Sequence, residues 1–297
     1  MIKHKLFLFL SLIFICVYNP SYAVNNPAAV INSNGEIVVS NNGGGIFEPD
    51  EYYVTIYKIS LSNVAPIAPT ASVPFNDSKS VTIFENPEGW RMRVINGVPT
   101  SPKGVTFPPF GTYSYAHIEL APEIEIMAHA KFDQPIKLSY DSAIPAQPAG
   151  TYFWSKTGDR WVYEDRNNDR NIRVGYGQTW NKEESGITKL NINTFDENGS
   201  SYIANTTTSM GNTTGYLVSS NKTLGSGNGI GIMGTVDKMI VLMQFSTPLN
   251  IAKDSALEVS FDVSQSVSVN CHRSNSSSPY TIWSFTPQFF NIRITSK

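Results

Sequence analysis

The chain has 297 residues, with Lys+Arg 22 against Asp+Glu 24 and a formal net charge of −2. A weakly acidic chain without basic clusters lacks the electrostatic footprint that nucleic-acid binding requires, so that class of function is excluded. The length is enough to bury the core of one large β domain or of two smaller ones.

The N-terminus predicts a cleaved secretory signal. Lys3 and Lys5 precede a largely apolar run, residues 6–17, and small residues stand at the outer positions of the closing tripeptide, Ser21 and Ala23. The apolar run is too short for a stable membrane span. We therefore expect residues 1–23 to be a signal peptide and residues 24–297 to be one large exported β domain, at the cell surface or outside the cell and without a membrane span.

Cysteine usage indicates how the mature domain is stabilised. The two cysteines are Cys16, inside the predicted signal, and Cys271. An intramolecular disulfide is then impossible, although the compartment would permit one, so a hydrophobic core must hold the domain together. Cys271 is expected to be a semi-buried or loop thiol.

The secondary structure is predicted to be almost entirely β. Short runs rich in Val, Ile, Tyr, Phe and Thr are bounded by Pro, Gly, Asn or Asp, and no long stretch has a helical period. Many short strands of this kind favour a sandwich or a barrel. Between Gly199 and Val236 we expect long polar loops with one hairpin. The predicted strands are 36–40, 52–61, 80–84, 90–95, 112–120, 124–132, 135–140, 152–155, 161–163, 172–176, 187–192, 216–219, 235–245, 257–269 and 289–295.

The clearest single pattern is the alternation in Leu257–Val269. Apolar side chains occupy the odd positions and polar ones the even positions, and only Gln265 interrupts the apolar row. This predicts one long strand with a buried face and a wet face, spanning about 40 Å at roughly 3.3 Å per residue.

A second alternation predicts a hairpin in residues 112–132, with its turn at Pro122. The even positions, from Ile118 to Phe132, would form the buried face. Pairing Leu120 with Ile124 then brings four polar side chains together on the outer face. These are His117, Glu119, Glu125 and His129, ligand types that suit zinc; a solvated polar face without a metal is the preferred interpretation.

No motif supports catalysis. The glycine run 229–234 matches the letters of a dinucleotide fingerprint but precedes a β run instead of a helix. Residues 165–169 carry oxygen ligands at alternate positions, yet the Gly and Glu of a calcium-binding EF-hand loop are missing. With few candidate bases, no nucleophile motif and no cofactor motif, the chain is not expected to be an enzyme and no cofactor is predicted.

Aromatic residues crowd the stretch 152–180, interleaved with charged and amide side chains. Such pairs of a stacking face and a hydrogen-bonding group suit sugars or protein surfaces. Trp154 and Trp161 could instead be core residues of adjacent strands, whereas Trp180 lies in a polar stretch and is the better exposed candidate. The predicted glycan or receptor site comprises Trp154, Trp161, Tyr163 and Trp180.

The two ends of the mature chain alternate as well. Near the signal, Ile31, Ile37 and Val39 fall on one side of a predicted strand, and Phe290, Ile292 and Ile294 do so close to the C-terminus. With the export signal, length and strand-rich composition, this resembles the subunits of bacterial chaperone-usher fimbriae, particularly the K88 (F4)-like subunits.

The resemblance implies an immunoglobulin-like β-sandwich with long elaborated loops and an incomplete core. A periplasmic chaperone, and later the N-terminal segment of a neighbouring subunit, would fill the groove by strand addition. Residues 29–40 would be the donor segment and the C-terminal strand would pair with the chaperone. The paired cysteines of many fimbrial subunits are absent, and Ser296 stands where a penultimate Tyr is frequent.

The resemblance implies a structural or adhesive subunit of a fimbrium that binds a host glycan or glycoprotein receptor. Two other classes of protein stay open. A free secreted lectin would use the aromatic stretch, and a β-pore-forming toxin would use the serine-rich alternation of Leu257–Val269 to face lipid on one side and water on the other.

Overall fold

The computed structural model describes residues 28–39, 45–99, 102, 104–138, 145–156, 161–164, 172–175, 178–179, 181–192, 201–208, 210–226, 236–272, 277–287 and 291–296. The predicted signal peptide, the acidic turn 165–169 and the glycine run 229–234 lie outside these residues. The described chain is all-β, as predicted, with one short 3₁₀ helix, Lys182–Glu184. Within it, no helix is long and apolar enough to cross a membrane.

The strands are β1 (Gly45–Phe47), β2 (Glu51–Ser62), β3 (Val81–Val94), β4 (Gly111–Met127), β5 (His129–Lys131), β6 (Ile136–Leu138), β7 (Tyr152–Ser155), β8 (Trp161–Glu164), β9 (Ile172–Gly175), β10 (Gln178–Thr179), β11 (Thr188–Asn191), β12 (Ile203–Thr208), β13 (Gly211–Val218), β14 (Lys238–Ile251), β15 (Leu257–Asp262), β16 (Val267–His272), β17 (Tyr280–Pro287) and β18 (Asn291–Ser296).

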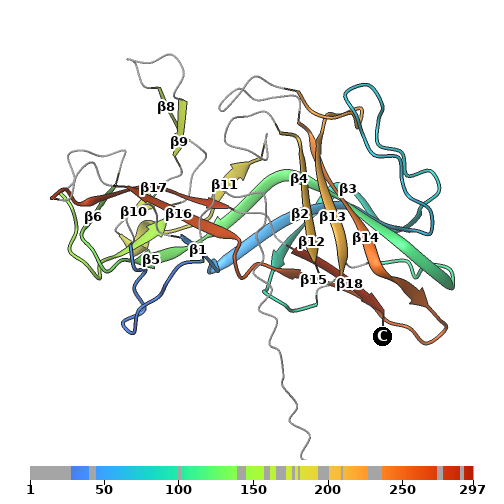
Figure 1. Cartoon of the computed structure of the whole chain (residues 1–297), viewed down its shortest axis with the longest axis horizontal. Coiled ribbons are helices and arrows are strands. Elements are labelled where there is room, and N and C mark those ends of the chain that lie inside the picture. Colours follow the sequence, from blue (N-terminus) through green and yellow to red (C-terminus); the bar gives the residue numbers. More distant parts are fainter. Residues whose placement is uncertain are drawn as a thin grey trace, which may run out of the picture.

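The largest sheet has seven strands in the order β12-β13-β14-β4-β2-β3, and β11 pairs with the far end of β4. All of its pairs are antiparallel, and β4 runs through the middle of the molecule (Figure 1). The hairpin expected between Gly199 and Val236 is present as β12 and β13. Strands this apolar on one face need a second layer to bury them.

The hairpin predicted in residues 112–132, with its turn at Pro122, is wrong. The chain continues through Pro122 as the single strand β4. β4 pairs with β14 up to Leu120 and with β11 from Glu123 onward. Pro122 lies where the partner changes, and the register against β2 also shifts there. A proline lacks the N–H that a regular ladder needs, but it is tolerated at such an irregularity. The predicted inward row is confirmed, since the even positions from Ile118 to Phe132 that were assigned to it are buried.

The long strand predicted at Leu257–Val269 is divided between two sheets. β15 pairs with β18, β16 pairs with β1 and β17, and Ser264 and Gln265 form a turn between them. Asp262 closes this turn by accepting hydrogen bonds from the backbone and hydroxyl of Ser264. The odd row is buried as predicted from Val259 onward except at Gln265, but Ser266 and Ser268 are buried too.

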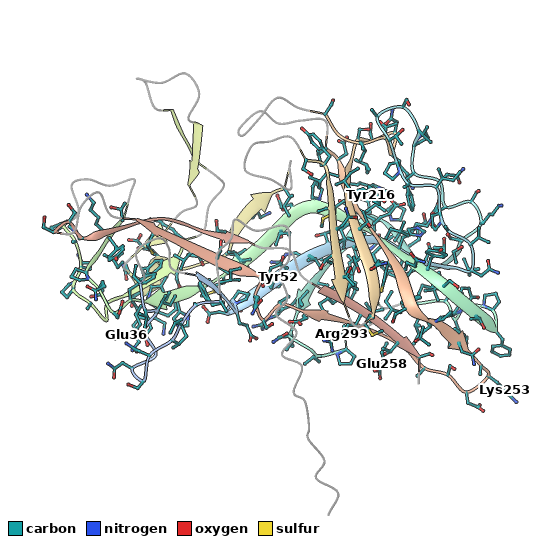
Figure 2. All side chains as sticks on the ribbon, in the orientation of Figure 1. Glu36, Tyr52, Tyr216, Lys253, Glu258 and Arg293 are labelled. Atoms are coloured by element: carbon teal, nitrogen blue, oxygen red, sulfur yellow. The ribbon has the colours of Figure 1, made fainter. Side chains whose placement is uncertain are left out.

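The large sheet, the sheets β1-β16-β17-β6 and β10-β7-β5 and the pair β15-β18 share a single cluster of buried residues, which extends from Ile37 to Ile294. Sheets β1-β16-β17-β6 and β10-β7-β5 lie at one end of the molecule, and the pair β15-β18 lies beside the large sheet (Figure 1). Tyr52 is fully buried near the middle, where burial raises the pKa of its hydroxyl (Figure 2). Cys271 is also buried, which raises the pKa of its thiol, so it is a core residue.

The other face of the large sheet is partly covered by residues 63–80, here called the crossing loop (Figure 1). Phe75 of this loop packs in a second cluster of buried residues with Tyr216, Val218 and Ile240. Its backbone N–H donates to the carbonyl of Lys222 over 2.9 Å. The central part of β4 is therefore buried on both faces.

Candidate functional site

The N-terminal segment turns back on itself, so the straight strand predicted through Ile31, Ile37 and Val39 is wrong. The side-chain oxygen of Asn32 accepts the backbone N–H groups of Asn34 and Glu36, and Gly35 takes the left-handed φ of 74° that the turn requires. An Asn-Ser-Asn-Gly sequence therefore favours a turn over continuation of the strand. The turn brings Ile31 opposite Ile37.

The two arms of this segment differ in burial. Ile31 is 53% exposed, whereas Ile37 is 3% and Val39 is 8% exposed, and both of the latter belong to the main core. Ile37 donates its N–H to the carbonyl of Lys131 over 2.8 Å and accepts from the N–H of Asp133 over 3.1 Å. Ile37 thus forms an isolated parallel bridge with Phe132, just beyond the end of β5.

The C-terminal strand β18 places Ile292 and Ile294 in the same core, as the alternation predicted. Phe290 lies outside the described residues. β15 is the only strand paired with β18 through the backbone within the described chain, so the opposite edge of β18 carries no paired strand there. Arg293, between the two isoleucines, is exposed (Figure 2).

A cluster of three aromatic rings covers the surface of β5 and β7, and we call it the aromatic platform. The register pairs His129 with Trp154, and their rings stack at a centroid distance of 4.6 Å. Tyr152, two residues before Trp154 on the same face, lies 6.0 Å from the Trp154 ring and 5.6 Å from that of His129. Tyr152 is 44% exposed.

Charged groups surround the aromatic platform. Asp50 accepts a 2.6 Å hydrogen bond from Nδ1 of His129, which fixes the orientation of that ring. The ammonium groups of Lys131 and Lys182 lie 5.3 Å and 5.4 Å from the ring centres of Tyr152 and Trp154. At these distances a cation is attracted by the face of the ring.

The other aromatic residues of the predicted site are not shown to join Trp154. Trp161 and Tyr163 lie on β8, which pairs with β9 and not with β7, and their side chains and Trp180 are outside the described part. His129 was missed as a neighbour of Trp154 because the sequence gives no register between β5 and β7. The signal that could have helped is the alternation of Tyr152 and Trp154, which places both rings on one face.

The four residues of the predicted zinc site are distributed over three places. Glu125 is held by Arg91, whose Nε and Nη2 donate to it in a fork with a shortest distance of 2.6 Å. The guanidinium of Arg91 also lies 3.8 Å from the ring centre of Tyr53. His129 belongs to the aromatic platform. Only His117 and Glu119 remain close together, because β4 is a single strand and not a hairpin.

His117 and Glu119 belong to a buried charge cluster between β4 and the crossing loop. Asp77 accepts hydrogen bonds from Nε2 of His117 over 3.0 Å and from Lys58 over 2.6 Å. These bonds hold the pKa of the Asp77 carboxyl well below its usual range. The sequence patterns did not indicate Asp77, because it lies in a loop that touches β4 only after folding.

Glu119 is the second carboxylate of this cluster. Lys222 and Lys238 donate to its two oxygens over 2.5 Å and 3.1 Å. Burial opposes its ionisation, but the two lysines outweigh that effect and its pKa is lowered. Ligand atoms of Asp77, His117 and Glu119 lie within 4.8 Å of one another, which is close enough for a metal. Lysines already neutralise both carboxylates, so a divalent cation would have to displace them.

Comparison with known proteins gives no family and no relative. No family model, no curated protein sequence and no solved structure matches the chain. The fold defines the class only as an all-β chain, and export stays a prediction from the N-terminal sequence. Its function therefore has to be argued from the geometry of its strand edges and its surface.

Proposed function

We propose that this protein is a structural or adhesive subunit of a chaperone-usher fimbrium, with an immunoglobulin-like β-sandwich completed by strand addition. The observation that carries the proposal is the unpaired edge of β18. Ile292 and Ile294 lie in the core, yet no strand other than β15 pairs with theirs along its backbone in the described chain. The hydroxyl of Ser296 alone donates to the carbonyl of Asn250 on β14, at the end of the strand. An exposed edge beside a core accepts a further strand from another chain by backbone hydrogen bonds.

The N-terminal segment supports the same proposal. Ile37 and Val39 are buried, although only backbone bridges join their segment to β5 and a few bonds join it to the rest of the chain. A segment that is held through backbone bridges and fills the core with alternate side chains has the properties of a donor. We propose that residues 29–40 leave their own core and fill that of a neighbouring subunit.

The proposal is tested with a chain that lacks residues 24–40. The truncated chain is expected to have a low Tm, because the core loses Ile37 and Val39, and a synthetic peptide of residues 29–40 is expected to raise it in trans. A peptide carrying Ile37→Asp and Val39→Asp is the control and should have no effect. Two results together would refute the fimbrial proposal. The truncated chain would be stable without the peptide, and the full mature chain would neither polymerise nor need a chaperone.

A free secreted lectin is the second candidate function, and the aromatic platform favours it. Its distinguishing prediction is a stable mature monomer that binds glycans without a chaperone. The pore-forming alternative loses its motivating pattern, because the apolar row of Leu257–Val269 packs in the core and its serines at 266 and 268 are buried.

A further inference from the structure

We infer that the aromatic platform of β5 and β7 binds an anionic saccharide unit, one that carries a carboxylate or a sulfate. This inference deepens the proposed adhesive function and rests on it for its biological context. The residues that carry it are those of the platform and its two cations: His129, Tyr152, Trp154, Lys131 and Lys182.

The rings provide the surface for stacking. Tyr152, Trp154 and His129 are contiguous, with centroid distances between 4.6 Å and 6.0 Å. They stand on paired strands, which hold them in place more rigidly than a loop would. The C–H groups on the apolar face of a pyranose ring pack on such surfaces, while its hydroxyl groups bond to polar groups at the edge. Tyr152, the most exposed of these rings, offers both a face and a hydroxyl.

The lysines determine the charge of the ligand. Neither Lys131 nor Lys182 forms an ion pair with a carboxylate in the described part of the chain; each lies against an aromatic ring instead. A cation–π contact at an exposed site is weak, whereas a charge-assisted hydrogen bond to an anion is strong. An anionic group at the edge of the platform would therefore draw these ammonium groups away from the rings and uncover the ring faces for the sugar.

Two nearby carboxylates already have other partners and leave the two lysines available. Asp50 is bonded to His129, and Glu184 lies 2.6 Å from Lys156. Glu183, next to Lys182, is exposed and has no ion-pair partner among the described residues. The negative charge of Glu183 opposes anion binding. Removing it should therefore raise the affinity for an anionic sugar, whereas removing the lysines should lower that affinity.

The test is a titration of the mature chain with a sialylated trisaccharide, its desialylated neutral counterpart and a sulfated disaccharide, followed by calorimetry and by NMR of the His129 ring. The sialylated or the sulfated sugar is expected to bind at least about tenfold more tightly than the neutral one, since each charge-assisted bond strengthens binding by that order. The two anionic probes distinguish a carboxylate from a sulfate as the recognised group.

Four variants locate the binding. The double variant Lys131→Gln with Lys182→Gln is expected to abolish the preference for the anionic sugar. Trp154→Ala is expected to weaken the binding of both anionic and neutral sugars. Glu183→Gln is expected to tighten the binding of the anionic sugar. Lys253→Gln is the matched control, because Lys253 is an exposed lysine that lies at the end of the molecule opposite to β5 and β10 (Figures 1 and 2). It should change nothing.

Equal affinity for neutral and anionic sugars, or no binding by either, would overturn the inference. So would a loss of affinity in the Lys253→Gln control as large as that in the double variant. The fimbrial proposal is independent of these results, because it fails or succeeds on the polymerisation and peptide rescue of residues 29–40, which do not involve a sugar.

Discussion

Nε2 of His117 lies 3.0 Å from Oδ2 of Asp77, and this hydrogen bond joins the central strand of the large sheet to the crossing loop. Because a carboxylate only accepts, the imidazole donates. The Phe75 ring packs in a T-shaped arrangement with the same imidazole, at a centroid distance of 5.1 Å. The crossing loop is thus held on the sheet by one buried ring and one charged anchor.

Removing the charged anchor should destabilise the fold. Asp77→Asn keeps the shape of the side chain but removes the negative charge of the oxygen to which both Lys58 and His117 donate, so Lys58 is left without its counter-ion. We expect the free energy of unfolding to fall by about 1–3 kcal/mol, measured by urea denaturation at pH 7. Asp254→Asn is the control, since Asp254 is exposed in a turn, and it should change the midpoint little. Equal midpoints for Asp77→Asn and the wild type would contradict an anchoring role.

The same carboxylates predict how stability depends on pH. The folded-state pKa of Asp77 lies below its ordinary value of 3.8, and that of Glu119 lies below 4.5. Each group therefore adds stability that is fully present above its ordinary pKa and is lost as the pH falls toward its folded pKa. The difference in stability between the wild type and Asp77→Asn should be constant from pH 7 to about pH 5 and narrow below about pH 4. Urea midpoints at each pH measure it, and a difference that widens on acidification would show the opposite sign.

The fork between Arg91 and Glu125 predicts that a lysine cannot replace this arginine. Lysine keeps the charge but loses both the paired geometry and the flat contact with the ring of Tyr53. We expect Arg91→Lys to lower the free energy of unfolding by about 1 kcal/mol, a modest value because the guanidinium is partly exposed. A double-mutant cycle with Glu125→Gln measures the coupling. Zero coupling would mean that the fork is only a surface contact.

Sequence patterns predicted which residues face the core but not which strands pair. The even positions of β4 from Ile118 onward and most of the odd positions after Leu257 are buried as predicted, because burial alternates with a period fixed by the backbone. Pro122 was interpreted as a turn because local propensity cannot show that β11, far along the chain, takes over as partner there. The strand β17, which pairs with β16 and β6, was not predicted, although its own residues are rich in β-branched and aromatic side chains.

The candidate site shows the same limit. Composition is enough to select Trp154, but its neighbour His129 is assigned to a metal site by a hairpin register that does not exist. Lys182 reaches Trp154 from a short 3₁₀ helix, and no period in the sequence relates the two. Contacts between residues far apart in the chain are set by sheet register and loop path, and neither can be read from one sequence without its fold.

Gly45 provides the test of how firmly the N-terminal segment is held. Its φ of 105° suits glycine, and a Cβ there would lie 2.6 Å from the Cα of Ala29, so Gly45→Ala should push residues 28 and 29 off β1. We expect the amide hydrogen of Ala29, which bonds to the carbonyl of Ile46 over 2.8 Å, to exchange at least about tenfold faster. Gly97→Ala is the matched control, because Gly97 also has a positive φ but a Cβ at that position would meet no atom within 4 Å. Gly97→Ala imposes the backbone strain without a clash against Ala29. Equal amide exchange rates for Ala29 in the two variants would therefore show that contact with β1 does not hold the segment.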